Sequence, residues 1–96
     1  VSKFAKGKSW IENRLADDLE QDGRHYTANL LARKGTGVQG FRVSVVFIDH
    51  EGGADVESAL PNAASTAEVH GVTRDLQADP ARLQSMLREA SAAASG

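Results

Sequence analysis

GFRVSVVFIDH, residues 40–50, is the stretch of this sequence that decides the fold. β-branched and aromatic residues dominate it, which favours a β-strand. Every second residue would lie on one face of that strand, and this set is wholly apolar: Phe41, Val43, Val45 and Phe47. The other face carries Val46 and Ile48 beside Arg42 and Ser44, so we expect a strand that is central or partly covered on both faces.

A glycine-rich loop precedes this strand. Residues 35–40 read GTGVQG, which fits the G-x-G-x-x-G pattern of dinucleotide-binding folds. In those folds the glycines follow a strand and open a helix, whereas here they lead into a second strand. The preceding segment, RHYTANLLAR at residues 24–33, alternates with the period of a strand. We therefore expect a hairpin connection in which the glycines supply positive φ angles, and no nucleotide cofactor.

Two flanking segments extend the prediction. ADVESAL, residues 54–60, alternates more weakly after a glycine-rich turn and is the predicted third strand of an antiparallel meander. Upstream, Ser9-Trp10-Ile11-Glu12 fits a capping box, and Leu15 and Leu19 follow Ile11 at four-residue intervals. With Asp22-Gly23 as a C-terminal cap, this spacing predicts a helix over residues 10–22.

The C-terminal third predicts two helices. Ser65-Thr66-Ala67-Glu68 is a second capping box, and Asp79-Pro80 begins a last helix over residues 80–92. Gly71 costs about 1 kcal/mol relative to alanine in a helix interior, so it predicts either close packing or a weak helix there. The predicted fold is α+β and two-layered: a three-stranded antiparallel β-meander with one N-terminal helix and two C-terminal helices, in the order α-β-β-β-α-α.

Length and composition suit one compact domain, because the chain has 96 residues of which 41% are hydrophobic. We expect a flexible basic arm at residues 1–8, a single α+β domain at 9–92 and a frayed tail at 93–96. The absence of cysteine excludes disulfides, zinc fingers and thiol catalysis. No apolar run approaches the ~20 residues of a membrane helix, and no apolar stretch follows the N-terminal lysines as in a secretory signal. We therefore expect a cytoplasmic protein that does not bind membranes.

Charge is spread unevenly along the chain. Residues 1–42 hold eight Lys or Arg and five Asp or Glu, a net +3, whereas residues 43–96 hold three and eight, a net −5. This asymmetry is either a scatter of solvated charges or the mark of a charged partner. The candidate binding residues are the basic side chains of the arm and of the 33–42 hairpin: Lys3, Lys6, Lys8, Arg33, Lys34 and Arg42.

No catalytic or metal-binding set stands out. His25, His50 and His70 lack the paired spacing of metal ligands, and we predict no metal site and no cofactor. The carboxylates between residues 49 and 57 lack EF-hand spacing. We interpret these carboxylates as a charged, solvent-exposed edge that discourages pairing with the strands of another chain. The alternative is that they act in acid–base catalysis or bind a hard cation. Trp10 is predicted to be a core anchor rather than a stacking platform.

The α-β-β-β-α order over about residues 10–78 resembles the double-stranded-RNA-binding domain, and the meander followed by a helix is similar to the small arm-binding domains of phage-type integrases. The first resemblance implies lysines at the start of the final helix, and the second implies a basic sheet face. Here the helix start reads Ser65-Thr66-Ala67-Glu68-Val69, and the third strand bears Asp55 and Glu57. Because phosphate contacts supply most nucleic-acid affinity, we assign the chain to neither family.

The functional expectation is a small non-enzymatic module that binds another protein or a second copy of itself. It would present one sheet face or the 34–42 hairpin. The alternative is a nucleic-acid-binding accessory domain that uses the basic arm and the 33–42 hairpin.

Overall fold

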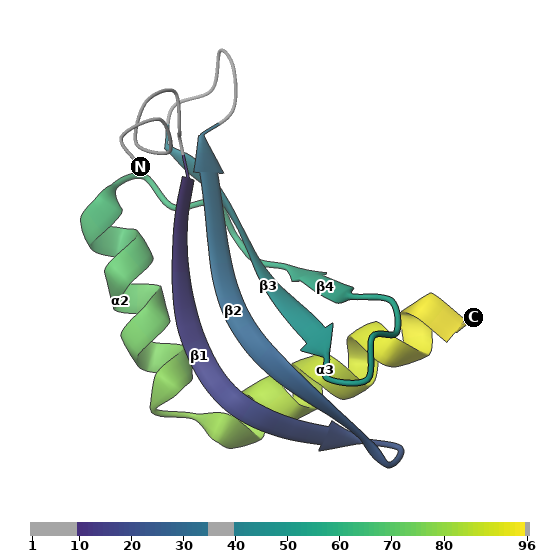
Figure 1. The fold of residues 1–96 in the computed structure, drawn as a ribbon. Coiled ribbons are helices and arrows are strands. Elements are labelled where there is room, and N and C mark those ends of the chain that lie inside the picture. Colours follow the sequence, from purple (N-terminus) through teal and green to yellow (C-terminus); the bar gives the residue numbers. More distant parts are fainter. Residues whose placement is uncertain (1–9, 35–39, 96) are drawn as a thin grey trace, which may run out of the picture.

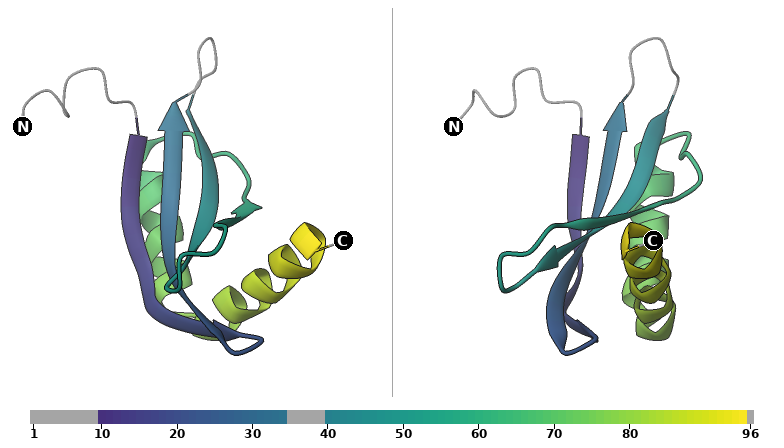
Figure 2. Two further views of the ribbon diagram at one scale, coloured as in Figure 1. Left: turned by 45° about the vertical axis from the view of Figure 1, so that its right-hand side comes forward. Right: turned by 90° about the vertical axis from the view of Figure 1, so that its right-hand side faces the viewer.

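The computed structural model describes residues 10–34 and 40–95 (Figure 1). Four antiparallel strands follow one another in sequence and in space: β1 (Trp10–Gln21), β2 (Arg24–Lys34), β3 (Phe41–Asp49) and β4 (Val56–Ala59). Two helices follow, α2 (Thr66–Gln77) and α3 (Pro80–Ser95). The fold is a four-stranded meander with both helices on one face of the sheet (Figure 2). The predicted three-stranded order α-β-β-β-α-α is therefore wrong, while the broader α+β class and the meander are confirmed.

The error lies in residues 10–22, which form strand β1 and not a helix. Ile11, Leu15 and Leu19 are spaced four residues apart. Because four is a multiple of two, this spacing fits the two-residue period of a strand as well as the turn of a helix. Two shifts in the β1–β2 register, between Arg14 and Ala16 and between Ala16 and Leu19, break the alternation that would have revealed a strand. Such bulges bend a strand, and β1 curves strongly along the sheet (Figure 1).

Asp22 and Gly23 form the turn of the β1–β2 hairpin, and they do not cap a helix. Gln21 pairs with Arg24, so the connection has two residues, and these have φ angles of 55° and 78°. Positive φ at both central positions is the requirement of a type I′ turn, for which Asp-Gly is a preferred sequence. Pairing with β2 therefore overrides the helical preference of residues 10–21.

Strand β3 follows the prediction closely. It pairs antiparallel with β2 from Lys34↔Phe41 to Tyr26↔Asp49, so the glycine-rich loop joins two antiparallel strands as expected. Of that loop, residues 35–39 lie outside the described residues. Gly40 has a φ of 83°, and Phe41 beside it exchanges two backbone hydrogen bonds with Ala63, of 2.7 and 3.0 Å.

The helices begin where the sequence predicts. Ser65 is the N-cap of α2, and its hydroxyl accepts the Glu68 amide at 3.2 Å; the Glu68 carboxylate in turn accepts the Ala64 amide, one residue before the expected partner. Gly71 has open space where a Cβ would lie, so no close packing explains it. Helix α3 extends to Ser95, beyond the predicted end at residue 92. Neither described helix combines the length and apolarity that crossing a bilayer requires.

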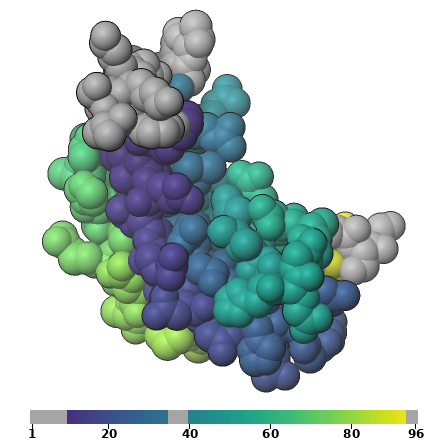
Figure 3. Space-filling model, in the orientation of Figure 1, coloured from purple at the N-terminus to yellow at the C-terminus, as the bar shows by residue number. Residues whose placement is uncertain are grey.

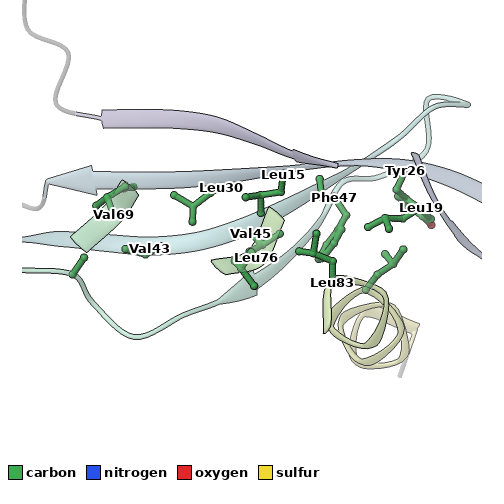
Figure 4. Close-up of a cluster of buried hydrophobic side chains, with 14 residues drawn as sticks. Leu15, Leu19, Tyr26, Leu30, Val43, Val45, Phe47, Val69, Leu76 and Leu83 are labelled. Atoms are coloured by element: carbon green, nitrogen blue, oxygen red, sulfur yellow. The ribbon is translucent and has the colours of Figure 1, made fainter. Parts of the chain in front are cut away.

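The core lies between the sheet and the helices. Side chains from one face of all three long strands point toward the helices, where they meet Val69 and Leu76 of α2 and Leu83 of α3 (Figure 4). Leu87 of α3 belongs to the same buried cluster. Phe47 is the largest fully buried side chain. Burying a large apolar side chain contributes about 1.5–3 kcal/mol, so this single layer of contacts holds the helices to one face.

Helix side chains also cap the edge of β1. The Gln77 amide donates to the Arg14 carbonyl at 2.8 Å, and the Gln84 amide donates to the Glu20 carbonyl. Asn13 adds a hydrogen bond of 3.0 Å to the Thr73 hydroxyl. The two glutamine contacts occupy backbone acceptors that an edge strand would otherwise offer to another chain.

Candidate functional site

The candidate site is the face of the sheet that the helices do not cover, which we call the open face. Because side chains alternate along a strand, the strand registers determine its members. Figure 2 shows the helices on the opposite side, and Figure 3 views the open face from the front. Its residues are Trp10, Glu12, Arg14, Glu20, His25, Thr27, Asn29, Leu31, Arg33, Arg42, Ser44, Val46, Ile48, Glu57 and Ala59.

Two arginines lie together at one end of the open face. Arg33 and Arg42 are partners in the β2–β3 register, and both are exposed. Neither forms an ion pair with another residue in the described part of the chain. Both line a shallow hollow of about 570 Å³ together with Ser44, Glu57 and Asn62. This arrangement leaves two adjacent cations available to an external anionic group.

Apolar side chains lie beside and below the arginines. Trp10, the partner of Arg33 on β1, is 47% exposed, and Ile48 on β3 is 37% exposed. Leu31 and Val46 lie between them and are half-buried. A second hollow, of about 310 Å³, opens between Trp10, Leu31 and Arg33. The prediction of Trp10 as a core anchor is therefore wrong, because residue 10 belongs to a strand and its side chain lies away from the helices.

A polar network spans β1 and β2 in the middle of the open face. Asn29 is buried, and its Oδ1 accepts from Arg14 Nε at 3.0 Å while its Nδ2 donates to Glu12 Oε2 at 3.4 Å. Arg14 also forms an ion pair of 2.7 Å with Asp17. The network satisfies the buried amide, as a buried polar group requires, and it holds Arg14 and Glu12 in place.

Histidines and carboxylates gather at the far end of the open face. His25 and His50 stack with ring centroids 6.4 Å apart, His25 Nδ1 lies 2.8 Å from Asp18 Oδ1, and His50 Nε2 lies 2.8 Å from Thr27 Oγ1. The hydrogen bond and the charge of Asp18 raise the pKa of His25. No three histidine or carboxylate side chains converge to hold a metal ion in residues 10–34 and 40–95.

Asp49 behaves differently from the solvent edge predicted for residues 49–57. Its side chain is only 3% exposed; it accepts the Glu51 amide at 2.8 Å and pairs with Arg24 at 2.7 Å. The Glu51 amide and the Arg24 guanidinium lower the pKa of Asp49 despite its burial. A Cβ at Gly53 would collide with this carboxylate. Asp49 thus joins the start of β2 to the β3–β4 turn, on the helix side of the sheet.

The predicted binding residues divide into three groups. Lys3, Lys6 and Lys8 lie outside the described residues. Arg33 and Arg42 come together on the open face, and Lys34 pairs with Phe41 on the alternate side of the strands. Sequence reasoning placed Ile48 on the second face of its strand, but it missed Trp10 and the carboxylates of β1 as members of this surface, because it placed β1 in a helix. The Asp-Gly turn was the signal that could have found them.

Comparison with protein families, with curated proteins and with solved structures finds no match for this chain.

Proposed function

We propose that this protein is a small non-enzymatic module that binds another protein through the open face of its sheet. The observation that carries the proposal is the one-sided cover of the sheet, which leaves Trp10 and Ile48 exposed beside two arginines. Within residues 10–34 and 40–95 neither arginine forms an ion pair. Antiparallel sheets often expose one face, but that face is then usually polar. Apolar side chains ringed by charges of both signs are typical of a protein-binding surface.

The distribution of perturbed groups supports binding rather than catalysis. Among the described residues, shifted pKa values occur at Arg24, His25 and Asp49, at the start of β2 and the end of β3. The hollow beside Trp10 lies at the opposite end of the sheet. Catalytic sites usually bring perturbed titratable groups into one concave pocket. We extend the proposal to a cytoplasmic location, which the cysteine-free sequence supports and cell fractionation would test.

Residue-specific photocross-linking in the native cell tests this function. A photoreactive phenylalanine analogue would replace Ile48 on the open face, and a matched control would carry it at Arg74, an exposed position of α2. We expect protein adducts from position 48 and few from position 74. Equal adducts at both positions, or none at position 48, would overturn the proposal.

A second candidate is the binding of single-stranded nucleic acid, which the Trp10–Arg33–Arg42 row favours. An aromatic ring beside two cations can stack a base and contact phosphates. Lys3, Lys6 and Lys8 would add cations under this hypothesis. The fluorescence anisotropy of a labelled oligonucleotide, measured at two salt concentrations, tests this candidate. Binding that weakens steeply with salt and disappears in Arg33→Ala supports it. The absence of binding at low salt rejects it.

A further inference from the structure

Two hollows of the open face meet at Arg33. The smaller, of about 310 Å³, is lined by Trp10, Glu12, Leu31 and Arg33. The larger, of about 570 Å³, lies between Arg33, Arg42 and β4. Trp10, Arg33 and Arg42 are register partners on three adjacent strands, so they form one row across the sheet, which we call the Trp–Arg row. At ~4.8 Å between neighbouring strands, this row is about 10 Å long.

Two carboxylates border the Trp–Arg row without pairing with its arginines. Within residues 10–34 and 40–95, neither Arg33 nor Arg42 forms an ion pair. Glu12 instead accepts a hydrogen bond of 3.4 Å from Asn29, which lies four residues from Arg33 along β2. Glu57 lies level with the fourth residue beyond Arg42 on β3, about 13 Å along the strand. The arginines can therefore accept an external anion, and the two carboxylates limit the negative charge that this anion can carry.

We propose that the open face binds the free C-terminus of a partner protein whose last residue is apolar. This inference rests on the proposed function and names the chemistry of the partner. The terminal carboxylate would accept hydrogen bonds from Arg33 and Arg42, and the last side chain would fill the smaller hollow against Trp10. The preceding residues would cross the larger hollow, where Ser44 and Asn62 supply a hydroxyl and an amide for the peptide backbone.

The balance of charge favours a carboxylate over a phosphate. A guanidinium group matches the two oxygens of a carboxylate in a bidentate contact. A carboxylate carries a single negative charge, whereas a phosphorylated side chain carries about −1.5 to −2 and a nucleic acid carries one charge per phosphate along its length. Two arginines bordered by Glu12 and Glu57 suit the single charge. A strand of phosphates crossing the face would approach both carboxylates, which repel it.

The apolar hollow favours a chain terminus over an internal acidic side chain. In a C-terminal residue, the carboxylate and the side chain are bonded to the same Cα, so they reach neighbouring positions. In an extended peptide, the next side chain on the same face as an internal aspartate lies two residues, or about 6.6 Å, away. Trp10 and Arg33 are partners on strands only ~4.8 Å apart, which suits groups that leave a single Cα.

Peptide titration, followed by NMR of the ¹⁵N-labelled full chain, tests the inference. The probes are pools of hexapeptides that are randomised over uncharged residues before the last position. One pool ends in leucine with a free carboxylate, a second ends in leucine amide, and a third ends in leucine amide after a fixed aspartate. We expect the free-acid pool to bind with a Kd between about 10 µM and about 1 mM, as suits a small contact. The two amidated pools should bind at least about tenfold more weakly.

Variants of the Trp–Arg row locate the binding. Arg33→Gln and Arg42→Gln should each weaken binding of the free-acid pool at least about tenfold, because the carboxylate loses a charged donor. Arg88→Gln, the same change at an exposed position of α3, should bind like the wild type. Trp10→Ala should abolish the preference for leucine over glycine at the last position but keep the dependence on the carboxylate. The NMR spectra themselves establish that each variant is folded.

Several outcomes would overturn the inference. They are equal binding of the free-acid and leucine-amide pools, no binding of the free-acid pool at about 2 mM, and binding unchanged in both arginine variants. Equally tight binding of the aspartate pool would overturn it in favour of an internal acidic segment. Tighter binding of a single-stranded oligonucleotide would overturn it in favour of the nucleic-acid candidate.

The cross-linking experiment separates this inference from the proposed function. Protein adducts at position 48 without peptide binding would leave the proposed function standing and remove only the C-terminus as the bound element. The absence of both adducts and peptide binding would remove both proposals.

Discussion

Replacing Gly40 by alanine tests the contact between the start of β3 and the segment that precedes α2. Gly40 has a φ of 83°, and a Cβ there would collide with the carbonyl oxygen of Ala63. That oxygen accepts the Phe41 amide at 2.7 Å, and the Phe41 carbonyl accepts the Ala63 amide at 3.0 Å. The substitution therefore strains the backbone at residue 40 and separates the two partners of this bridge.

The expected loss combines two effects. A residue with a Cβ costs about 1–2 kcal/mol in the left-handed region, and two backbone hydrogen bonds contribute about 0.5–1.5 kcal/mol each. We expect Gly40→Ala to lower the free energy of unfolding by about 2–5 kcal/mol. A 96-residue domain has roughly 5–14 kcal/mol in total, so the variant should fold but be clearly weakened. Its Tm should fall by roughly 10–25 °C.

Gly71→Ala is the matched control, because Gly71 lies in α2 with nothing within 4 Å of the position of a Cβ. This variant should gain about 0.5–1 kcal/mol, since alanine favours the helix and restricts the unfolded chain. Urea unfolding, followed by Trp10 fluorescence and by circular dichroism, measures both changes, and coincident transitions would validate the two-state treatment. A loss below about 0.5 kcal/mol in Gly40→Ala, or a similar loss in both variants, would refute the reasoning.

Three further predictions concern electrostatics and the sheet edge. Backbone amides and an arginine hold the pKa of Asp49 below its ordinary value, so its contribution to stability is complete above about pH 4 and is lost as pH falls through the folded pKa. The urea midpoints measured at pH 7 and at pH 3 should therefore differ less in Asp49→Asn than in the wild type. Equal pH slopes in the two proteins would contradict this. His25 should titrate above its ordinary pKa in NMR spectra and return toward it in Asp18→Asn, whereas an unchanged midpoint would argue against the hydrogen bond. Gln77→Ala should lower the free energy of unfolding by about 1 kcal/mol, because the Arg14 carbonyl loses the hydrogen bond from the Gln77 amide. Chemical denaturation measures this change. An unaltered midpoint would show that water replaces the amide with no loss of stability.

The sequence was sufficient where local pattern and tertiary environment agree. Strand β3 alternates cleanly because one of its faces is the core, and the buried residues 43, 45 and 47 could be identified in advance. The start of α2 could also be predicted, because a helix cap is a local interaction, here between Ser65 and Glu68. Arg33 and Arg42 could be associated because they flank one hairpin loop.

The remainder depended on distant contacts. Residues 10–21 have a spacing that suits a helix or a strand, and only pairing with β2, with its two bulges, selects the strand. That choice moves Trp10 to the open face and brings Asp18 to His25. His25 and His50 stack although they are 25 positions apart, and their spacing in the sequence did not indicate this contact.

By itself, therefore, the sequence determined the central strands, the two C-terminal helices and the arginine pair, because each follows from neighbouring residues. Only the tertiary structure decided the identity of β1 and the composition of the open face. The physical reason is that β-pairing satisfies the backbone through residues far along the chain, so the side of the sheet on which a side chain lies is set by its partner strand.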